Sequence, residues 1–237
     1  MATSTQKKKA AEDLAGVLNE QVALESLSKA EHFFETNKTK ILSVLGAIVL
    51  LALAYFTYRS LYLPRQEASA QEQVFAAQRA FDKGNYDVAL NGDGNNPGFV
   101  QVADDFGSTK AGNLASYYAG ICYLNKGEFQ KAIDYLSDFE GNDEVVSSMA
   151  LGAMGDAYTE LNDMDTGIDY YKRAANNSRN EFTAPMFLFK AAMASESKGD
   201  FGGAKNLYEQ IKQNHPESQQ ARDIDKYIDR AAAKAGA

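Results

Sequence analysis

The sequence has few of the residues that most often carry chemistry. It has no tryptophan, one cysteine (Cys122) and two histidines, His32 and His215, which lie far apart in the chain. A single cysteine excludes an intrachain disulfide and a paired-cysteine metal or redox site. Glycine-rich nucleotide-binding motifs, the HExxH zinc motif and the GxSxG nucleophile motif are also absent. The sequence therefore predicts that the protein is not an enzyme and needs no cofactor or metal.

Basic residues are scarce in the larger part of the chain. Residues 66–237 contain 16 Lys and Arg against 26 Asp and Glu, whereas residues 1–65 contain 8 against 6. A protein that binds nucleic acid needs a basic surface that displaces the counterions of the phosphates. The acidic body therefore predicts that the protein does not bind nucleic acid.

Charge is missing altogether from Ile41 to Tyr58, and the apolar character continues to Leu63. A helix of these 23 residues would be ~34 Å long, against a hydrocarbon thickness of ~30 Å. Tyrosine, phenylalanine and arginine follow at its C-terminal end, as is typical of a membrane interface. We therefore predict a transmembrane helix over 41–63. The residues assigned to this anchor are Ile41, Gly46, Tyr55, Phe56, Tyr58, Arg59 and Tyr62.

A cleavable signal sequence is the alternative for this stretch, because Ala68-Ser69-Ala70 has the form of a cleavage site. The long charged leader before the apolar run, and the length of that run, argue against it. Six lysines precede the span and only Arg59 and Arg65 follow it closely, which favours a cytoplasmic N-terminus. Within the leader, residues 12–35 form either a short amphipathic helix on the membrane or a weakly helical tail.

A short phrase recurs four times after the predicted span. The copies are KGNYDVA at 83–89, KGEFQKA at 126–132, LNDMDTG at 161–167 and KGDFGGA at 198–204, with start-to-start spacings of 43, 35 and 37. A glycine that ends one helix, an aromatic or Met that fills the space between two helices, and a small residue at their crossing together predict a helical hairpin. The residues at these three places are Gly84, Gly127, Gly199; Tyr86, Phe129, Met164, Phe201; and Ala89, Ala132, Gly167, Ala204.

These units resemble the tetratricopeptide repeat, a helix–turn–helix of ~34 residues. Most of the pattern is present, although no unit has its tryptophan and Ser195 replaces a tyrosine. The matching positions are Gly120, Tyr123, Ala132, Leu136; Gly155, Tyr158, Gly167, Tyr171; and Ala192, Ala204, Tyr208, Pro216. We therefore predict an all-α protein with a leader (1–40), a transmembrane helix (41–63), an α-solenoid of about four hairpins (64–218) and a capping helix with a tail (219–237).

The first unit is longer than the others by the segment Asn91–Gly98, which we interpret as a flexible loop that breaks its second helix. Its polar residues do not have the spacing of a calcium-binding loop, because Asn96 and Val102 occupy the places of the required Gly and Glu. The capping helix presents Ala221, Ile224, Ile228 and Ala231 on one face.

The tetratricopeptide pattern implies a concave groove lined by the first helix of each hairpin. Many of the residues at these positions are apolar, and three are Met, whose flexible side chain adapts to varied surfaces. The groove candidates are Leu114, Tyr117, Ile121, Met149, Asp156, Thr159, Met186, Phe189 and Met193. An equally weighted interpretation is that some of these side chains belong to the hydrophobic core.

The whole layout is similar to that of the YfgM-type ancillary subunits of the bacterial SecYEG translocon. The similarity is carried by HFFETNKTK (32–40) before the span and AYFTYRSLY (54–62) at its end, whereas the insertion at 91–98 departs from that family. The resemblance implies a single-pass inner-membrane protein with periplasmic repeats. It also implies two partners, the translocon and a membrane-anchored periplasmic chaperone. An assembly scaffold of another envelope complex, or a cytoplasmic adaptor if the topology is reversed, remains the alternative.

Overall fold

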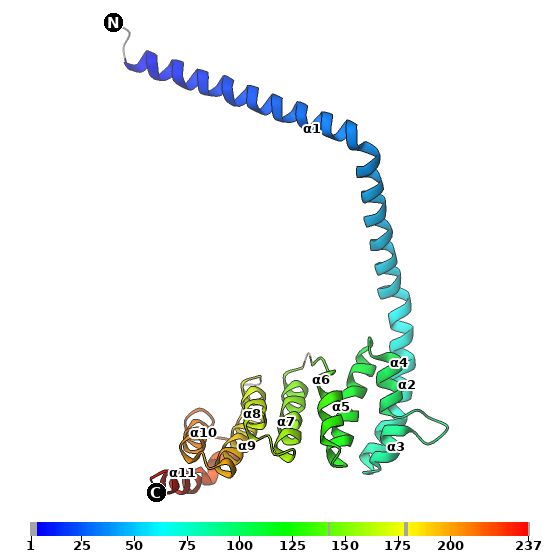
Figure 1. Ribbon diagram of the computed structural model, residues 1–237, viewed down its shortest axis with the longest axis vertical. Helices are drawn as coiled ribbons and strands as arrows, with labels where there is room; N and C mark the ends of the chain where they lie inside the picture. Colours follow the sequence, from blue (N-terminus) through cyan, green and yellow to red (C-terminus); the bar gives the residue numbers. More distant parts are fainter. Residues whose placement is uncertain (1–3, 142, 178–179, 237) are drawn as a thin grey trace. The chain divides into compact units, whose positions relative to one another are not determined.

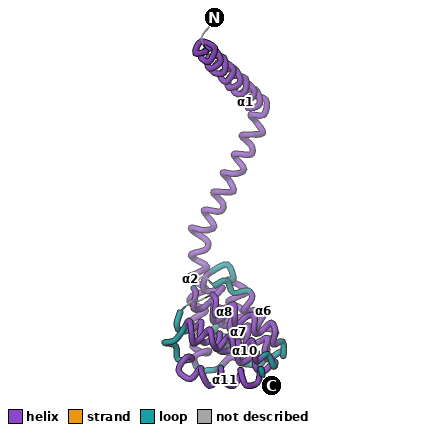
Figure 2. The backbone as a smooth tube through the Cα atoms, turned by 90° about the vertical axis from the view of Figure 1, so that its left-hand side faces the viewer, coloured by secondary structure: helices purple, strands orange, loops and turns teal. Residues whose placement is uncertain are grey.

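The computed structural model describes residues 4–141, 143–177 and 180–236. Every regular element in these residues is a helix, as Figure 2 shows. The chain divides into two compact units, Met1–Tyr62 and Leu63–Ala237. The predicted all-α class is therefore confirmed.

The first unit consists of α1 (Ser4–Thr57) and a short π-helix, η1 (Tyr58–Tyr62). Between residues 41 and 57 this helix carries no charged side chain. Thr57, at its end, donates its hydroxyl hydrogen to the carbonyl oxygen of Leu53 at 2.8 Å. Within η1 the rings of Tyr58 and Tyr62 stack with their centroids 5.4 Å apart. The side chains that would define an amphipathic leader helix, from Leu14 to Val22, lie outside the described part of the structure.

The second unit is built from antiparallel helix pairs that follow one another along the chain (Figure 1). Each pair packs against the next, so the hydrophobic core runs through the unit as a series of connected clusters. The helices are α2 (Leu63–Asp82), α3 (Tyr86–Asn91), α4 (Phe99–Phe106), α5 (Lys110–Asn125), α6 (Phe129–Ser137), α7 (Glu144–Glu160), α8 (Met164–Asn177), α9 (Thr183–Lys198), α10 (Phe201–Asn214), η2 (Gln220–Asp223) and α11 (Ile224–Ala235).

Left-handed residues join the two helices of each hairpin. Gly84, Gly127 and Gly199 have φ values of +71°, +76° and +89°, and Asn162 takes the same place in the third unit with φ +68°. Asn is the residue that adopts this conformation most readily after glycine. In all four turns the next amide bonds back to the carbonyl five residues earlier, for example Asp163 N–H to Tyr158 O at 2.9 Å. The recurring phrase is therefore a helix-ending motif.

Small residues allow the paired helices to approach closely. Ala89, Ala132 and Ala204 are fully buried at the crossings. A Cβ atom added to Gly120 would lie 2.5 Å from Cγ of Leu136. Such contacts leave no room for a larger side chain without movement of the neighbour.

The insertion in the first unit separates α3 from α4. The carboxylate of Asp93 accepts hydrogen bonds from the backbone N–H groups of Asn95 (3.0 Å) and Asn96 (2.8 Å), and these bonds, that of Asn96 first, lower the pKa of Asp93. Gly92 has φ +86°, and a Cβ on Gly98 would lie 2.1 Å from the carbonyl oxygen of Leu90. The loop is thus tied together by internal contacts, and its flexibility stays a prediction.

The first helix of the solenoid is attached by a long-range helix cap. The carboxylate of Glu67 in α2 accepts hydrogen bonds from the backbone N–H groups of Lys110 (2.7 Å) and Ala111 (3.3 Å). These amides have no partner inside α5 because they lie in its first turn. The carboxylate also interacts favourably with the positive end of the α5 dipole.

The last helix covers the opposite end of the core. Ile224 and Ala231 of α11 are buried, and Ala221 and Ile228 pack against the same cluster, which includes Leu207 and other residues of α8 to α10. The apolar face read from the sequence is therefore the face that α11 turns towards the preceding hairpin.

Candidate interaction surface

All nine groove candidates lie on α5, α7 and α9, the first helices of the three regular hairpins, and they form the candidate interaction surface. Eight of the nine are half-buried, and Met193 is 49% exposed. The half-buried residues are Leu114, Tyr117, Ile121, Met149, Asp156, Met186 and Phe189. Thr159 is half-buried as well. This intermediate exposure fits side chains that line a surface and also support it.

The α5 part of this surface is a partly covered aromatic and aliphatic patch. Tyr117 and Ile121 pack against a cluster that includes Leu136 and Met154. The Tyr117 ring lies 5.4 Å from that of Phe139, which follows α6. Burial raises the pKa of Tyr117. The patch therefore packs on side chains of two successive hairpins, from α6 and α7.

The α7 part of the surface combines the apolar Met149 with a polar cluster whose members are already paired. The carboxylate of Asp156 accepts a hydrogen bond from the Tyr171 hydroxyl at 2.6 Å and from Nζ of Lys190 at 2.7 and 2.8 Å. The Lys190 Nζ also lies 5.7 Å from the centroid of the Tyr171 ring. Burial raises the pKa of Tyr171, and the bond donated to Asp156 raises it further. Asp156 thus links α7, α8 and α9, and Thr159 bonds within α7 to the Gly155 carbonyl at 3.0 Å.

The α9 part of the surface is partly covered by the end of the chain. The ring of Phe189 lies 4.9 Å from that of Tyr227 in α11 and 5.6 Å from that of Tyr208 in α10. Met186 and Met149 pack against the same core cluster. Met193 is the groove candidate with a largely open side chain, so α9 presents its accessible apolar surface there.

The two interpretations of the groove candidates are therefore compatible. Five of them pack on the core from one side and keep another side open: Tyr117, Ile121, Met149, Met186 and Phe189.

In the second unit, two exposed aromatic residues were not among the predicted candidates. Phe75 on α2 is 60% exposed, with the Arg79 guanidinium 5.0 Å from its ring centroid, and Phe182 before α9 is 70% exposed. The spacing of Ala70, Val74 and Ala77 defines the buried face of α2, and Phe75 lies outside it. That helical spacing could have shown that Phe75 points away from the core. We find no comparable sequence signal for Phe182.

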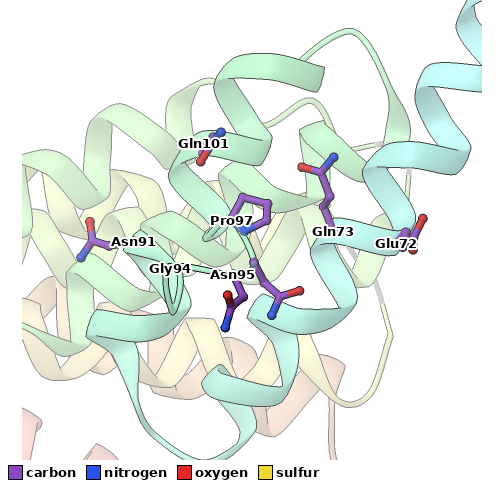
Figure 3. A pocket seen from close by; sticks show the side chains of 8 residues that line it. Glu72, Gln73, Asn91, Gly94, Asn95, Pro97 and Gln101 are labelled. Atoms are coloured by element: carbon purple, nitrogen blue, oxygen red, sulfur yellow. The ribbon is translucent and has the colours of Figure 1, made fainter.

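A polar cavity lies between α2, α4 and the insertion loop. Its volume is about 560 Å³, and amide side chains make up much of its lining (Figure 3). The lining residues are Glu72, Gln73, Asn91, Gly94, Asn95, Asn96, Pro97 and Gln101.

Metal-binding groups do not come together in the part of the chain that the structure describes. No cluster of three or more His, Cys, Asp or Glu that could hold a metal ion occurs among those that the structure describes. Cys122 is fully buried, and burial raises the pKa of its thiol to about 12. The thiol is therefore protonated and shielded at neutral pH, and it behaves as a small hydrophobic side chain.

Six of the seven predicted anchor residues are exposed in the first unit. Tyr55 and Phe56 are 63% and 67% exposed, and a Cβ on Gly46 would meet no atom within 4 Å. The helical segment Glu31–Asp82 contains an 18-residue window of mean hydropathy 2.2, of which nothing is buried. Ile41 is half-buried, whereas Tyr58, Arg59 and Tyr62 are exposed. By length and composition this helix is able to cross a membrane.

The comparisons with known proteins agree with this architecture. The family model of the tetratricopeptide repeat matches residues 114–142 and 187–218, which fall on the second and fourth hairpins. A search of the curated proteins finds no match to this sequence.

Solved structures resemble the chain at low sequence identity. Nearly identical TPR-like repeats of a Podosopora anserina protein assigned as a kinesin light chain superpose with a TM-score of 0.54 and 14% identity, over 72% of this chain and 88% of theirs. Two crystal structures of MamA have TM-scores of 0.48, with 19% and 21% identity, over 70% and 68% of this chain and 92% and 94% of theirs.

The repeat motif in the sequence and the helical hairpins in the structure indicate the same architecture for the second unit. The left-handed turns and the small residues at the helix crossings recur every 35 to 43 residues along the second unit, and the family model matches two of the hairpins. Tetratricopeptide arrays generally present a surface for other proteins and carry no catalytic groups. The second unit is therefore an α-solenoid of helical hairpins, two of which match the tetratricopeptide repeat, and such repeats imply a protein–protein interaction scaffold.

Proposed function

We propose that this protein is a non-enzymatic scaffold anchored in a bacterial inner membrane by residues 41–63, with a cytoplasmic N-terminus and periplasmic repeats. The proposal rests on the combination of two features in one chain. One is an apolar helix whose side chains are not buried, and the other is a solenoid with repeats of a kind that binds proteins. In water, side chains such as those of Leu50 and Leu51, 69% and 71% exposed, would be costly to leave uncovered, whereas lipid covers them at no such cost.

We further propose that the scaffold joins the Sec translocon to a membrane-anchored periplasmic chaperone and assists secreted proteins as they emerge. This part rests on the resemblance carried by residues 32–40 and 54–62. The exposed rings of Phe33 and Tyr55 in these segments fit contacts made at or near the membrane. The half-buried side chains of α5, α7 and α9 are separate from these segments and offer a surface for a second partner.

Protease protection tests the topology. In spheroplasts, external protease is expected to remove the repeat unit and leave a membrane-bound fragment of about the first 65 residues. A protein that is cleaved only after lysis would have its repeats in the cytoplasm. That result would refute the translocon proposal and leave a cytoplasmic adaptor on a membrane anchor.

Photo-crosslinking tests the partners. A photoreactive residue at Phe56 should capture a translocon subunit, and one at Met193 should capture the chaperone, since both side chains are exposed. The matched control is Asn206, an exposed residue on the second helix of the last hairpin. Repeated absence of both partners would contradict the proposal. A different envelope complex captured at the same positions would favour the assembly-scaffold alternative.

A further inference from the structure

The cavity beside the insertion loop collects amide groups from separate elements. Gln73 comes from α2, Asn91 from the end of α3, Asn95 from the loop and Gln101 from α4. Figure 3 shows Gln73, Asn95 and Gln101 around Pro97. Residues that are distant in sequence thus line one cavity of about 560 Å³.

Several donors and acceptors of these side-chain amides form no hydrogen bond within the described part of the protein. No hydrogen bond joins the side chain of Gln73 or Asn95 to another group in the described part of the chain, and each offers donors and an acceptor. Asn91 uses its Nδ2 to donate to the Asp87 carbonyl at 3.0 Å, which leaves its Oδ1 available. The Nε2 of Gln101 reaches Asp105 at 3.4 Å, so its Oε1 is likewise available.

The loop is held in place before any ligand arrives. Asp93 bonds two following amides, and the backbone of Gly98 lies directly against that of Leu90. A ligand would therefore not have to order this segment, and the entropic cost of binding is lower for that reason.

We propose that this cavity binds an extended peptide segment of another protein through its main chain, with a basic side chain of that segment near Glu72. An Asn or Gln side chain matches a peptide group, since each has a donor and an acceptor in one plane. Glu72 is the ionisable residue of the lining, and it supplies one negative charge. A sugar would be expected to need an aromatic ring to stack on, and the lining contains none. The site is separate from the groove, so it goes beyond the proposed membrane function.

The test uses the full chain in detergent micelles and a fluorescein-labelled peptide of Gly, Ser and Lys, with binding measured by fluorescence anisotropy. The paired substitution Gln73→Leu and Asn95→Leu removes the hydrogen-bonding groups of both side chains. It is expected to weaken binding about ten-fold. The matched control, Asn206→Leu on α10, should bind like the unchanged protein. An N-methylated version of the peptide, which has no main-chain donors, should bind about ten-fold more weakly.

The charge is tested separately. Glu72→Gln should reduce the preference for the lysine peptide over a matching peptide of Gly, Ser and Glu. Three outcomes would overturn the proposal: no binding of the lysine peptide, equal binding by the paired variant, or equal binding of the N-methylated peptide. Binding of a chito-oligosaccharide that the paired variant loses, without binding of the peptide, would assign the cavity to a glycan and overturn it too. None of these results depends on the crosslinks from Phe56 and Met193, so the two proposals can fail independently.

Discussion

Gly155 of α7 provides the sharpest test of how tightly the hairpins pack. An alanine at this position would gain about 1 kcal/mol of helix propensity relative to glycine. Its Cβ, however, would lie 2.6 Å from two carbons of the Tyr171 ring. Tyr171 is 5% exposed and its hydroxyl is bonded to Asp156, so the ring has little freedom to move. Overpacking of this kind costs ~1–3 kcal/mol. We therefore expect Gly155→Ala to destabilise the solenoid by about 1 kcal/mol.

Thermal unfolding of the full chain, followed by circular dichroism, measures this balance. For a domain of this size, 1 kcal/mol corresponds to a shift of about 2–4 °C in Tm. Gly202→Ala is the matched control, because its Cβ would lie 4.0 Å from the nearest atom, Oδ1 of Asp200. There the propensity gain should appear alone, as an unchanged or slightly higher Tm. If Gly155→Ala raised the Tm as much as Gly202→Ala, the close contact with Tyr171 would not be rigid and our reasoning would be wrong.

Three further predictions concern the end of the solenoid, its turns and its buried thiol. Glu67→Gln should lower the stability by about 1 kcal/mol, because the charged cap of α5 is lost; Glu72→Gln is the control, and equal Tm values would contradict the capping role. Asn162→Ala should cost about 1 kcal/mol in urea unfolding because of its left-handed backbone, whereas Asn162→Gly should be tolerated. Cys122 should react slowly with maleimide in the native protein and quickly in denaturant, since burial raises its pKa to about 12. Raising the pH from about 7 to 9 should therefore accelerate labelling of the denatured protein and leave native labelling slow.

The interaction surface also changes the way in which partner binding should be tested. Asp156 and Phe189 are engaged within the protein, by Lys190 and Tyr227. Substitution of either would disturb the packing between hairpins as well as any contact with a partner. Met193, with an open side chain, is the more informative position for a binding variant.

Much of the architecture could be predicted from the sequence because its signals are local. Each turn and the start of the helix that follows it are described within seven residues. These residues include a left-handed Gly or Asn, an aromatic residue or Met two positions later, and a small residue three positions after that. The same is true of the one-sided spacing of Ile224, Ile228 and Ala231 in α11. The apolar helix over 41–63 is read from its own composition alone, and its insertion into a membrane remains a prediction.

The accessibility of the groove was decided only by the tertiary structure. Lys190 reaches Asp156 across 34 positions of sequence, and Tyr227 lies over Phe189 from the last helix. Helical spacing places a side chain on a face, but it does not determine which distant side chain covers that face. The cap that Glu67 gives to α5 and the amide cavity between α2 and α4 depend on long-range packing for the same reason. The sequence by itself thus determined the hairpins and their order, because each is specified by neighbouring residues. The packing of successive hairpins decided which surfaces stay open, because those contacts join residues far apart in the chain.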